Sequence, residues 1–204
     1  MSQASVTATR DRVPGWFGKL PGLGDFAGRR LPDDFVHRWD EWLQAGLAQA
    51  SRDPDWLARY LVAPIRRFWL APGLVDPHGW AGLLMPSVDR VGRHFPLTLA
   101  QPVPSLAAAL AAGDWLGRLD GAARRVLDMD YTVDDFEQAL AALAGPPREP
   151  PDAASQRLAQ ALGAALDGGS VWWPPGASQD AEFDCHPGGL PPAPALAAML
   201  GGAP

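Results

Sequence analysis

Cysteine is almost missing from the sequence: Cys185 is the only one in 204 residues. A lone cysteine cannot close an internal disulfide, so the chain suits a reducing compartment. Long hydrophobic runs are missing too, because no stretch approaches the roughly 18 uninterrupted apolar residues typical of a membrane helix. Residues 1–13 are polar and lack the apolar segment of a secretory signal. These absences predict a cytoplasmic protein that does not insert into a membrane.

Positive charge is also scarce. The 17 Lys and Arg residues are outnumbered by 23 Asp and Glu, which gives a formal net charge of −6 and a pI near 5.1. Binding to a phosphate backbone requires a basic face, so nucleic acid is excluded as the main partner. Lys19 is the only lysine. We attribute this preference for arginine to the codon usage of a GC-rich genome.

Hydrophobic residues make up 47% of the chain and charged residues 20%, which is typical of a globular protein. We predict one α/β domain over residues 14–204, preceded by a disordered tail at residues 1–13. The 9 tryptophans are unusual for this length. Such rings either anchor a core or form the centre of an interface.

The order of the patterned segments predicts the fold class. Extended segments with Pro and Gly between them come first, amphipathic helices follow, and a late strand returns. We expect strands near residues 14–18 (an edge strand), 65–70, 80–85, 95–101 and 170–173. We expect helices starting near Pro32, Pro54, Leu106, Trp115 and Thr132, and a terminal turn near Ala195. A further helix that carries Leu158 should follow a proline-rich connector at residues 146–151. This order predicts a mixed sheet covered by helices on both faces, a three-layer sandwich in a single domain.

The glycine-rich segment at residues 18–28 resembles nucleotide-binding motifs but does not match them. A phosphate-binding loop requires Ser or Thr after its Gly-Lys pair, but Leu20 follows Lys19. The dinucleotide pattern fails because Gly28 lies one residue too far from Gly24. The sequence therefore predicts no nucleotide cofactor.

Catalytic and metal-binding patterns are not found either. His186 adjoins Cys185, but adjacent side chains of an extended segment point apart, so this histidine is poorly placed to activate the thiol. The four histidines are far apart and form no metal-ligand spacing. We predict no catalytic residues, no metal, no cofactor and no enzymatic activity; a hydrolase would require a histidine brought to Cys185 by the fold.

A charged run at residues 87–96 precedes a strand that should be buried, and two interpretations remain open for it. In the first, Arg90 or Arg93 pairs with an acid such as Asp25 or Asp89 and fastens the glycine loop to the sheet. In the second, the arginines face outward and bind a carboxylate or phosphate. We favour the structural interpretation for Arg90 and leave Arg93 open.

Trp172 and Trp173 form the last predicted strand. Successive side chains of a strand face opposite sides, so one ring would face the core and the other outward, where it could anchor an interface. The alternative is that a covering helix buries both rings.

Three ordered blocks resemble the TagF (ImpM) family of type VI secretion proteins. The first comprises GWFGKLP at 15–21, Gly-Asp-Phe at 24–26, Arg-Leu-Pro at 30–32 and Phe35. The second comprises PSVDRVGR at 86–93 and Phe-Pro-Leu at 95–97, and the third comprises Trp172-Trp173 and Gly-Leu-Pro at 189–191. The resemblance covers about residues 14–200.

This resemblance implies an α/β sandwich without known catalytic activity. It also implies a cytoplasmic, post-translational repressor of type VI secretion that binds other secretion components, a forkhead-associated scaffold protein among them. The alternative is a small-ligand or phosphopeptide sensor centred on Asp25, Arg90 and Arg93. The candidate structural or partner-binding residues are Asp25, Arg30, Asp89, Arg90, Arg93, Trp172 and Trp173.

Overall fold

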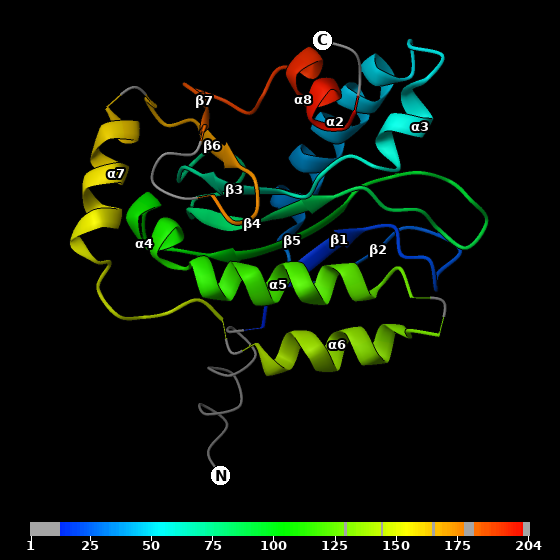
Figure 1. Cartoon of the computed structure of the whole chain (residues 1–204), viewed down its shortest axis with the longest axis horizontal. Helices are drawn as coiled ribbons and strands as arrows, with labels where there is room; N and C mark the ends of the chain where they lie inside the picture. The colour runs from blue at the N-terminus through cyan, green and yellow to red at the C-terminus, as the bar shows by residue number, and fades with distance from the viewer. Residues whose placement is uncertain (1–12, 129, 144, 165, 178–181, 202–204) are drawn as a thin grey trace.

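Figure 1 shows the computed structural model of the chain, which describes residues 13–128, 130–143, 145–164, 166–177 and 182–201. Apart from Val13, the predicted disordered tail at residues 1–13 lies outside these described residues. The described part forms one sheet with helices on both of its faces (Figure 1).

The sheet has seven strands in the order β2-β1-β5-β4-β3-β6-β7. Their bounds are β1 Gly15–Gly18, β2 Ala27–Arg29, β3 Arg66–Leu70, β4 Trp80–Met85, β5 Leu97–Pro102, β6 Ser170–Trp173 and β7 Asp184–His186. The strand predicted for the edge, β1, is second in the order because β2 pairs with its outer side.

The α/β class and the helices on both faces are confirmed, and one detail differs. We expected a mixed sheet, whereas every pairing between the named strands is antiparallel. Parallel neighbours require a long crossover between two adjacent strands. Here the loops 71–79 and 86–96 join direct neighbours into a meander, and the long helical connection links β5 to β6, which are not neighbours.

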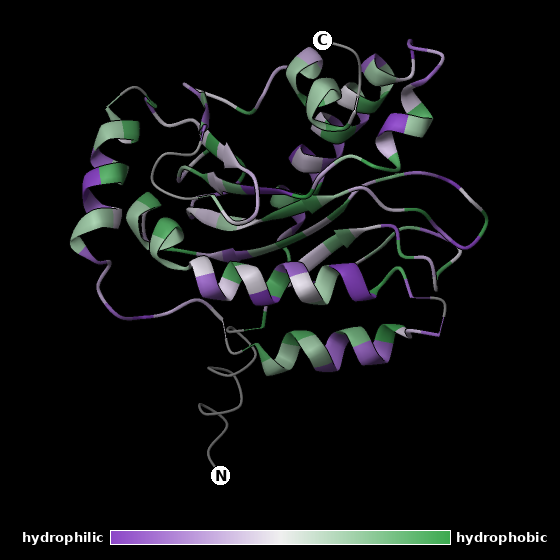
Figure 2. Ribbon diagram, viewed as in Figure 1, coloured by the Kyte–Doolittle hydropathy of each residue, from purple (hydrophilic) through white to green (hydrophobic). Residues whose placement is uncertain are grey.

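The helices divide between the two faces of the sheet (Figure 1). One layer holds α2 (Asp33–Ala50), α3 (Trp56–Tyr60) and α8 (Ala193–Met199). The other holds α4 (Leu106–Ala111), α5 (Gly113–Arg125), α6 (Val133–Ala142) and α7 (Ala153–Gly163). Hydrophilic and hydrophobic residues alternate along these helices, as expected of elements with one side on the sheet and one in solvent (Figure 2).

The alternation of strand side chains separates two cores. Phe68 and Leu70 of β3 face the α2 layer, and Trp69 faces the α5 layer. Trp172 and Trp173 are divided in the same way, and both rings are buried, at 0% and 4% exposure. Of the two interpretations that the sequence left open, the one with both rings buried is confirmed, and the one with an outward ring is wrong. Neither tryptophan is available to a partner, because each face of β6 is covered.

Local sequence signals explain where helices begin. The Thr132 hydroxyl accepts a hydrogen bond from the Asp135 N–H at 3.1 Å, and the Asp135 carboxylate accepts the Thr132 N–H at 3.0 Å. This reciprocal cap confirms the predicted start of α6. Asp33 and Asp34 lie in the first turn of α2, where the helix dipole favours negative charge.

The antiparallel order brings several connections to one end of the sheet. β1 and β4 finish there, while β3 and β5 start there. The loops 19–26, 61–65 and 86–96 therefore meet at this end, together with the α5–α6 connection around Leu127 (Figure 1). We call this region the loop end.

Candidate functional site

The centre of the loop end is a buried carboxylate. Asp89 Oδ1 accepts hydrogen bonds from the main-chain N–H groups of Val91 at 3.0 Å and Arg93 at 2.9 Å. Asp89 Oδ2 accepts one from Arg93 Nε at 2.7 Å and lies 3.1 Å from Lys19 Nζ. The side chain of Asp89 is fully buried. One acid thus fixes the turn of the loop 86–96 and joins it to the segment after β1.

Burial by itself would raise the pKa of the Asp89 carboxyl. The hydrogen bonds from the main chain and guanidinium of Arg93, from Lys19 and from Val91 outweigh burial and hold the pKa well below its ordinary value of 3.8. Asp89 is therefore ionised at neutral pH and serves as a structural anion.

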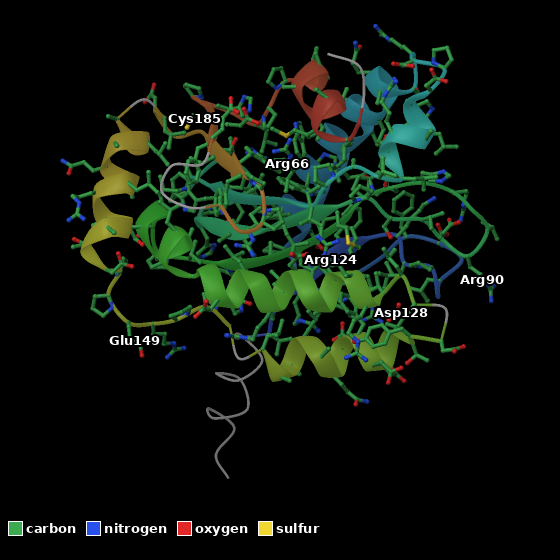
Figure 3. All side chains as sticks on the ribbon, in the orientation of Figure 1. Arg66, Arg90, Arg124, Asp128, Glu149 and Cys185 are labelled. Carbon is green, nitrogen blue, oxygen red and sulfur yellow. The ribbon has the colours of Figure 1, made fainter. Side chains whose placement is uncertain are left out.

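Arg93 extends the connection to the glycine loop. Its Nη2 donates to the Gly24 carbonyl and lies 3.8 Å from Asp25 Oδ1. The structural role that we favoured for Arg90 therefore belongs to Arg93. Gly92, with φ +84°, completes the turn that places Arg93 over Asp89. Arg90 forms no ion pair with a described residue, and Figure 3 shows it pointing away from the protein.

These contacts count against the alternative of a ligand site centred on Asp25, Arg90 and Arg93. Arg93 already donates to Asp89 and Gly24, so it has fewer donors for an external anion. Arg90 anchors the loop through its main chain only, since its N–H donates to the Leu23 carbonyl at 2.9 Å. Arg93 is thus largely committed to the protein itself, and Arg90 lacks an ion-pair partner among the described residues.

Close packing explains the glycine that ends β1. Gly18 has φ +139°, and a Cβ there would lie 2.2 Å from the Pro96 carbonyl oxygen. Only glycine fits such a contact. The close approach places Lys19 beside Asp89, and its Nζ also lies 4.8 Å from the centre of the Phe26 ring, within the range of a cation–π contact.

A second anchor joins the loop 86–96 to α3. The Tyr60 hydroxyl donates to the Ser87 carbonyl at 3.0 Å and accepts the Ser87 N–H at 2.9 Å. The Ser87 hydroxyl donates to the Lys19 carbonyl at 2.7 Å. Burial raises the pKa of Tyr60 far above its ordinary value, and the bond to Ser87 offsets only part of the effect. The loop end is therefore a rigid unit, because the loop 86–96 is bonded to Lys19, to Gly24 and to Tyr60 of α3.

Exposed hydrophobic side chains gather on this rigid unit. The large hydrophobic residues that stand exposed within the described ranges all come from its loops, from α3 and its C-terminal turn, or from the end of α5. They are Phe26 (46%), Leu57 (37%), Leu61 (58%), Val62 (80%), Val91 (65%) and Leu127 (49%). Scattered apolar side chains are ordinary on protein surfaces, but their confinement to one end is typical of a binding surface.

Arg30 lies elsewhere and acts as a clamp. Its guanidinium binds both carboxylate oxygens of Glu137 on α6, at 2.6 and 3.1 Å, and its Nε donates to the Pro14 carbonyl at 3.0 Å. The Trp16 indole N–H also donates to Glu137. Burial would raise the pKa of Glu137, but the bonds from Arg30 and Trp16 lower it below its ordinary value. Arg30 thus fastens the β1–β2 edge to α6.

Three residues that hold these connections were not among the predicted site residues: Lys19, Tyr60 and Glu137. Lys19 offered a signal, since a single lysine among many arginines stands where a compact ammonium group fits beside Asp89. Tyr60 and Glu137 depend on contacts across 27 and 121 residues of sequence. No local pattern reports such distant contacts.

The chemistry of Cys185 counts against a nucleophile. Burial raises the pKa of its thiol, and the charge of Asp184 raises it further. A nucleophilic thiol requires the opposite shift. Among the described residues, no three His, Cys, Asp or Glu side chains are grouped so as to hold a metal ion. In the same ranges no helix has the length and apolarity to cross a membrane.

The structure defines a class of protein: an antiparallel α/β sandwich whose interconnected loops present hydrophobic side chains at one end. The sequence profile of the TagF N-terminal domain, described as type VI secretion system-associated, matches residues 15–143. The chain therefore belongs to this family of type VI secretion-associated proteins.

A solved structure supports the fold. The chain is similar to the crystal structure of PA0076 from Pseudomonas aeruginosa PAO1, with 38% identity and a TM-score of 0.75. The similarity covers 92% of this chain and 93% of PA0076. A comparison with curated proteins finds no significant match.

Proposed function

We propose that this protein represses type VI secretion after translation, in the cytoplasm, by binding another component of the apparatus through the loop end. The observation that carries the proposal is the confinement of the exposed large hydrophobic residues of the described ranges to that end. Hydrophobic side chains on a rigid base lose little conformational entropy on binding, which favours their use as contact points.

The charges around the surface add specificity. Arg90 is exposed at the tip of the loop 86–96, while Asp25 is exposed beside it. Such rim charges guide the approach and orientation of a partner more than they add affinity. The first candidate partner is a forkhead-associated scaffold protein, which is the partner that the resemblance to the TagF family implies.

A binding titration with purified scaffold protein tests the proposal. Val62→Glu and Val91→Glu place a charge on the two most exposed hydrophobic positions, and each should weaken binding about tenfold or more. Ala161→Glu, on the exposed side of α7, is the matched control and should bind like the unmodified protein. Equal binding by all three variants would contradict the assignment of the surface.

Secretion in cells tests the regulatory role. Removing the gene should raise export of a secreted marker protein, and restoring the unmodified protein or Ala161→Glu should reduce it again. Val62→Glu and Val91→Glu should fail to reduce it while accumulating to the same level. Unchanged export on removal of the gene would end the proposal of a repressor.

A further inference from the structure

A buried arginine of β3 has no ion-pair partner among the residues that the structure describes. Arg67 of β3 is 8% exposed, and its Nε is buried without a hydrogen-bond partner. Its Nη2 lies beside α5, 3.7 Å from where a Cβ on Gly117 would be. Leaving the charge of a largely buried arginine unpaired is costly, so Arg67 is a favourable contact point for an anion.

No described acid neutralises Arg67 by contact. Asp120 of α5 influences it through space, but Asp120 Oδ1 accepts a hydrogen bond from Arg124 Nε at 2.9 Å. Burial lowers the pKa of Arg67 below its ordinary value, and the charge of Asp120 restores only part of that loss. No described residue therefore forms an ion pair with the guanidinium of Arg67.

Arg67 lines a cavity of about 230 Å³ between α4, α5, α7 and the end of β6. Polar groups make up somewhat more than half of its exposed wall, and apolar side chains form the rest, among them Leu110, Leu116, Leu158, Trp173 and Phe183. The volume is below the roughly 300–1,000 Å³ of a site for a drug-sized ligand. It suits a small molecule with one polar end and an apolar body.

The carboxylate that lines this cavity, Asp152, already accepts hydrogen bonds from its own helix. Asp152 caps α7: its Oδ1 accepts the N–H groups of Ala154 and Ser155, both at 2.8 Å, and its Oδ2 accepts the Ser155 hydroxyl at 3.0 Å. Asp152 is thus engaged with its own helix, and its charge disfavours a doubly charged anion more than a singly charged one. One guanidinium beside one carboxylate favours a singly charged ligand.

We propose that this cavity binds a small monocarboxylate, with the carboxylate on Arg67 and an apolar body against Trp173 and Phe183. A carboxylate fits the planar guanidinium through paired hydrogen bonds. The site lies on the opposite face of β3 from the α2 layer and is separate from the loop end, so its test is independent of the proposed repression.

Benzoate and butyrate, an aryl and an alkyl monocarboxylate, are the probes. Both should bind the full chain in calorimetric titrations and raise its thermal midpoint, and benzamide, the neutral counterpart of benzoate, should do neither. Arg67→Met should weaken binding of the carboxylates at least tenfold. Arg66→Met is the matched control: it removes the neighbouring arginine, whose side chain lies on the other face of β3, and should bind as the unmodified protein does.

The stability of the ligand-free variant separates a binding role from a structural one. Methionine keeps the unbranched apolar stem of the side chain and removes the unpaired charge, so Arg67→Met should melt no lower than the unmodified protein. A markedly lower midpoint, binding that persists in Arg67→Met, or no binding of either carboxylate would overturn the proposal. Stronger binding of inorganic phosphate than of benzoate would overturn it as well.

A second variant keeps the proposal testable if Arg67→Met does not fold. Leu158→Glu places a carboxylate of the chain itself in the cavity, on the first helix turns of α7. This variant should no longer bind benzoate, and its thermal midpoint should rise because Arg67 gains a partner. A lower midpoint with unchanged benzoate binding would contradict the assignment.

Discussion

Lys19 Nζ and Asp89 Oδ2 lie 3.1 Å apart inside the protein, where the side chains are 6% and 0% exposed. Removing one partner of a buried ion pair costs more than the pair contributes, because the remaining charge loses both its solvent and its counterion. This contact therefore joins the loop 86–96 to the end of β1 more firmly than a surface ion pair would.

Lys19→Met should lower the urea midpoint of unfolding, and Asp89→Asn should lower it further, since Asp89 also binds Arg93 and Val91. Asp25→Asn serves as the control, because Asp25 is 81% exposed and lies 3.8 Å from Arg93. Its midpoint should stay unchanged. Equal midpoints for all three variants would show that the buried pair does not stabilise the fold.

The pH dependence of stability should depend on Asp89. The pKa of Asp89 in the folded protein is held below its ordinary value of 3.8. Its contribution to stability is therefore present above about pH 3.8 and is lost as the pH falls below that value. The midpoint of Asp89→Asn should lie well below that of the unmodified protein at neutral pH, and the gap should narrow in acid. A gap that stays constant between about pH 7 and pH 2 would contradict this account.

Two glycines should respond in opposite directions to alanine. Gly18→Ala should destabilise the protein by about 2 kcal/mol or more, because a Cβ collides with the Pro96 carbonyl at a positive φ. Gly121→Ala, inside α5 with open space around the added Cβ, should stabilise it by about 0.5–1 kcal/mol. Chemical denaturation of both variants measures the contrast.

Arg30 and Glu137 should show coupling in a double-mutant cycle. Arg30→Met and Glu137→Gln should each cost about 1–3 kcal/mol, and the double variant should cost less than their sum. Neither change should alter the affinity for a partner at the loop end, because the clamp lies on α6. A loss of affinity with Arg30→Met at unchanged stability would make Arg30 a contact residue instead.

Cys185 should react slowly with alkylating reagents at neutral pH. Its pKa is raised above the ordinary value of 9.0, so the thiolate is rare until the solution is strongly alkaline. The rate of iodoacetamide labelling should be lower than that of free cysteine at about pH 7. Cys185→Ala should bind the proposed partner normally; rapid labelling at neutral pH would restore the thiol as a candidate nucleophile.

The sequence could predict those parts of the fold that depend on residues close together in the chain. Thr132 and Asp135 cap α6 as expected, because both partners of the cap lie within one turn. The alternation of Phe95, Leu97 and Leu99 likewise predicted a strand; Leu97 and Leu99 share one core, whereas Phe95, which precedes β5, packs in the other. Strand direction was not predictable in this way, because it depends on which strands become neighbours.

The site shows the same division between local and distant contacts. Asp89 and Arg93 were named as candidates because both lie in the charged run before β5, and the structure pairs them. The assignment of the structural arginine failed because Arg90 and Arg93 differ only in how Gly92 turns the chain. Both rings of Trp172 and Trp173 are buried because α2 and the segment around Phe183 cover opposite faces, and these elements are far from them in sequence.

The sheet finishes at both sides in strands of only three residues, β2 and β7. So short a border offers few free amide and carbonyl groups to an incoming strand, which protects the protein from edge-to-edge aggregation. It also makes strand addition a poor way to capture a peptide. Recognition is left to side chains, so point substitutions can abolish an association without disturbing the backbone.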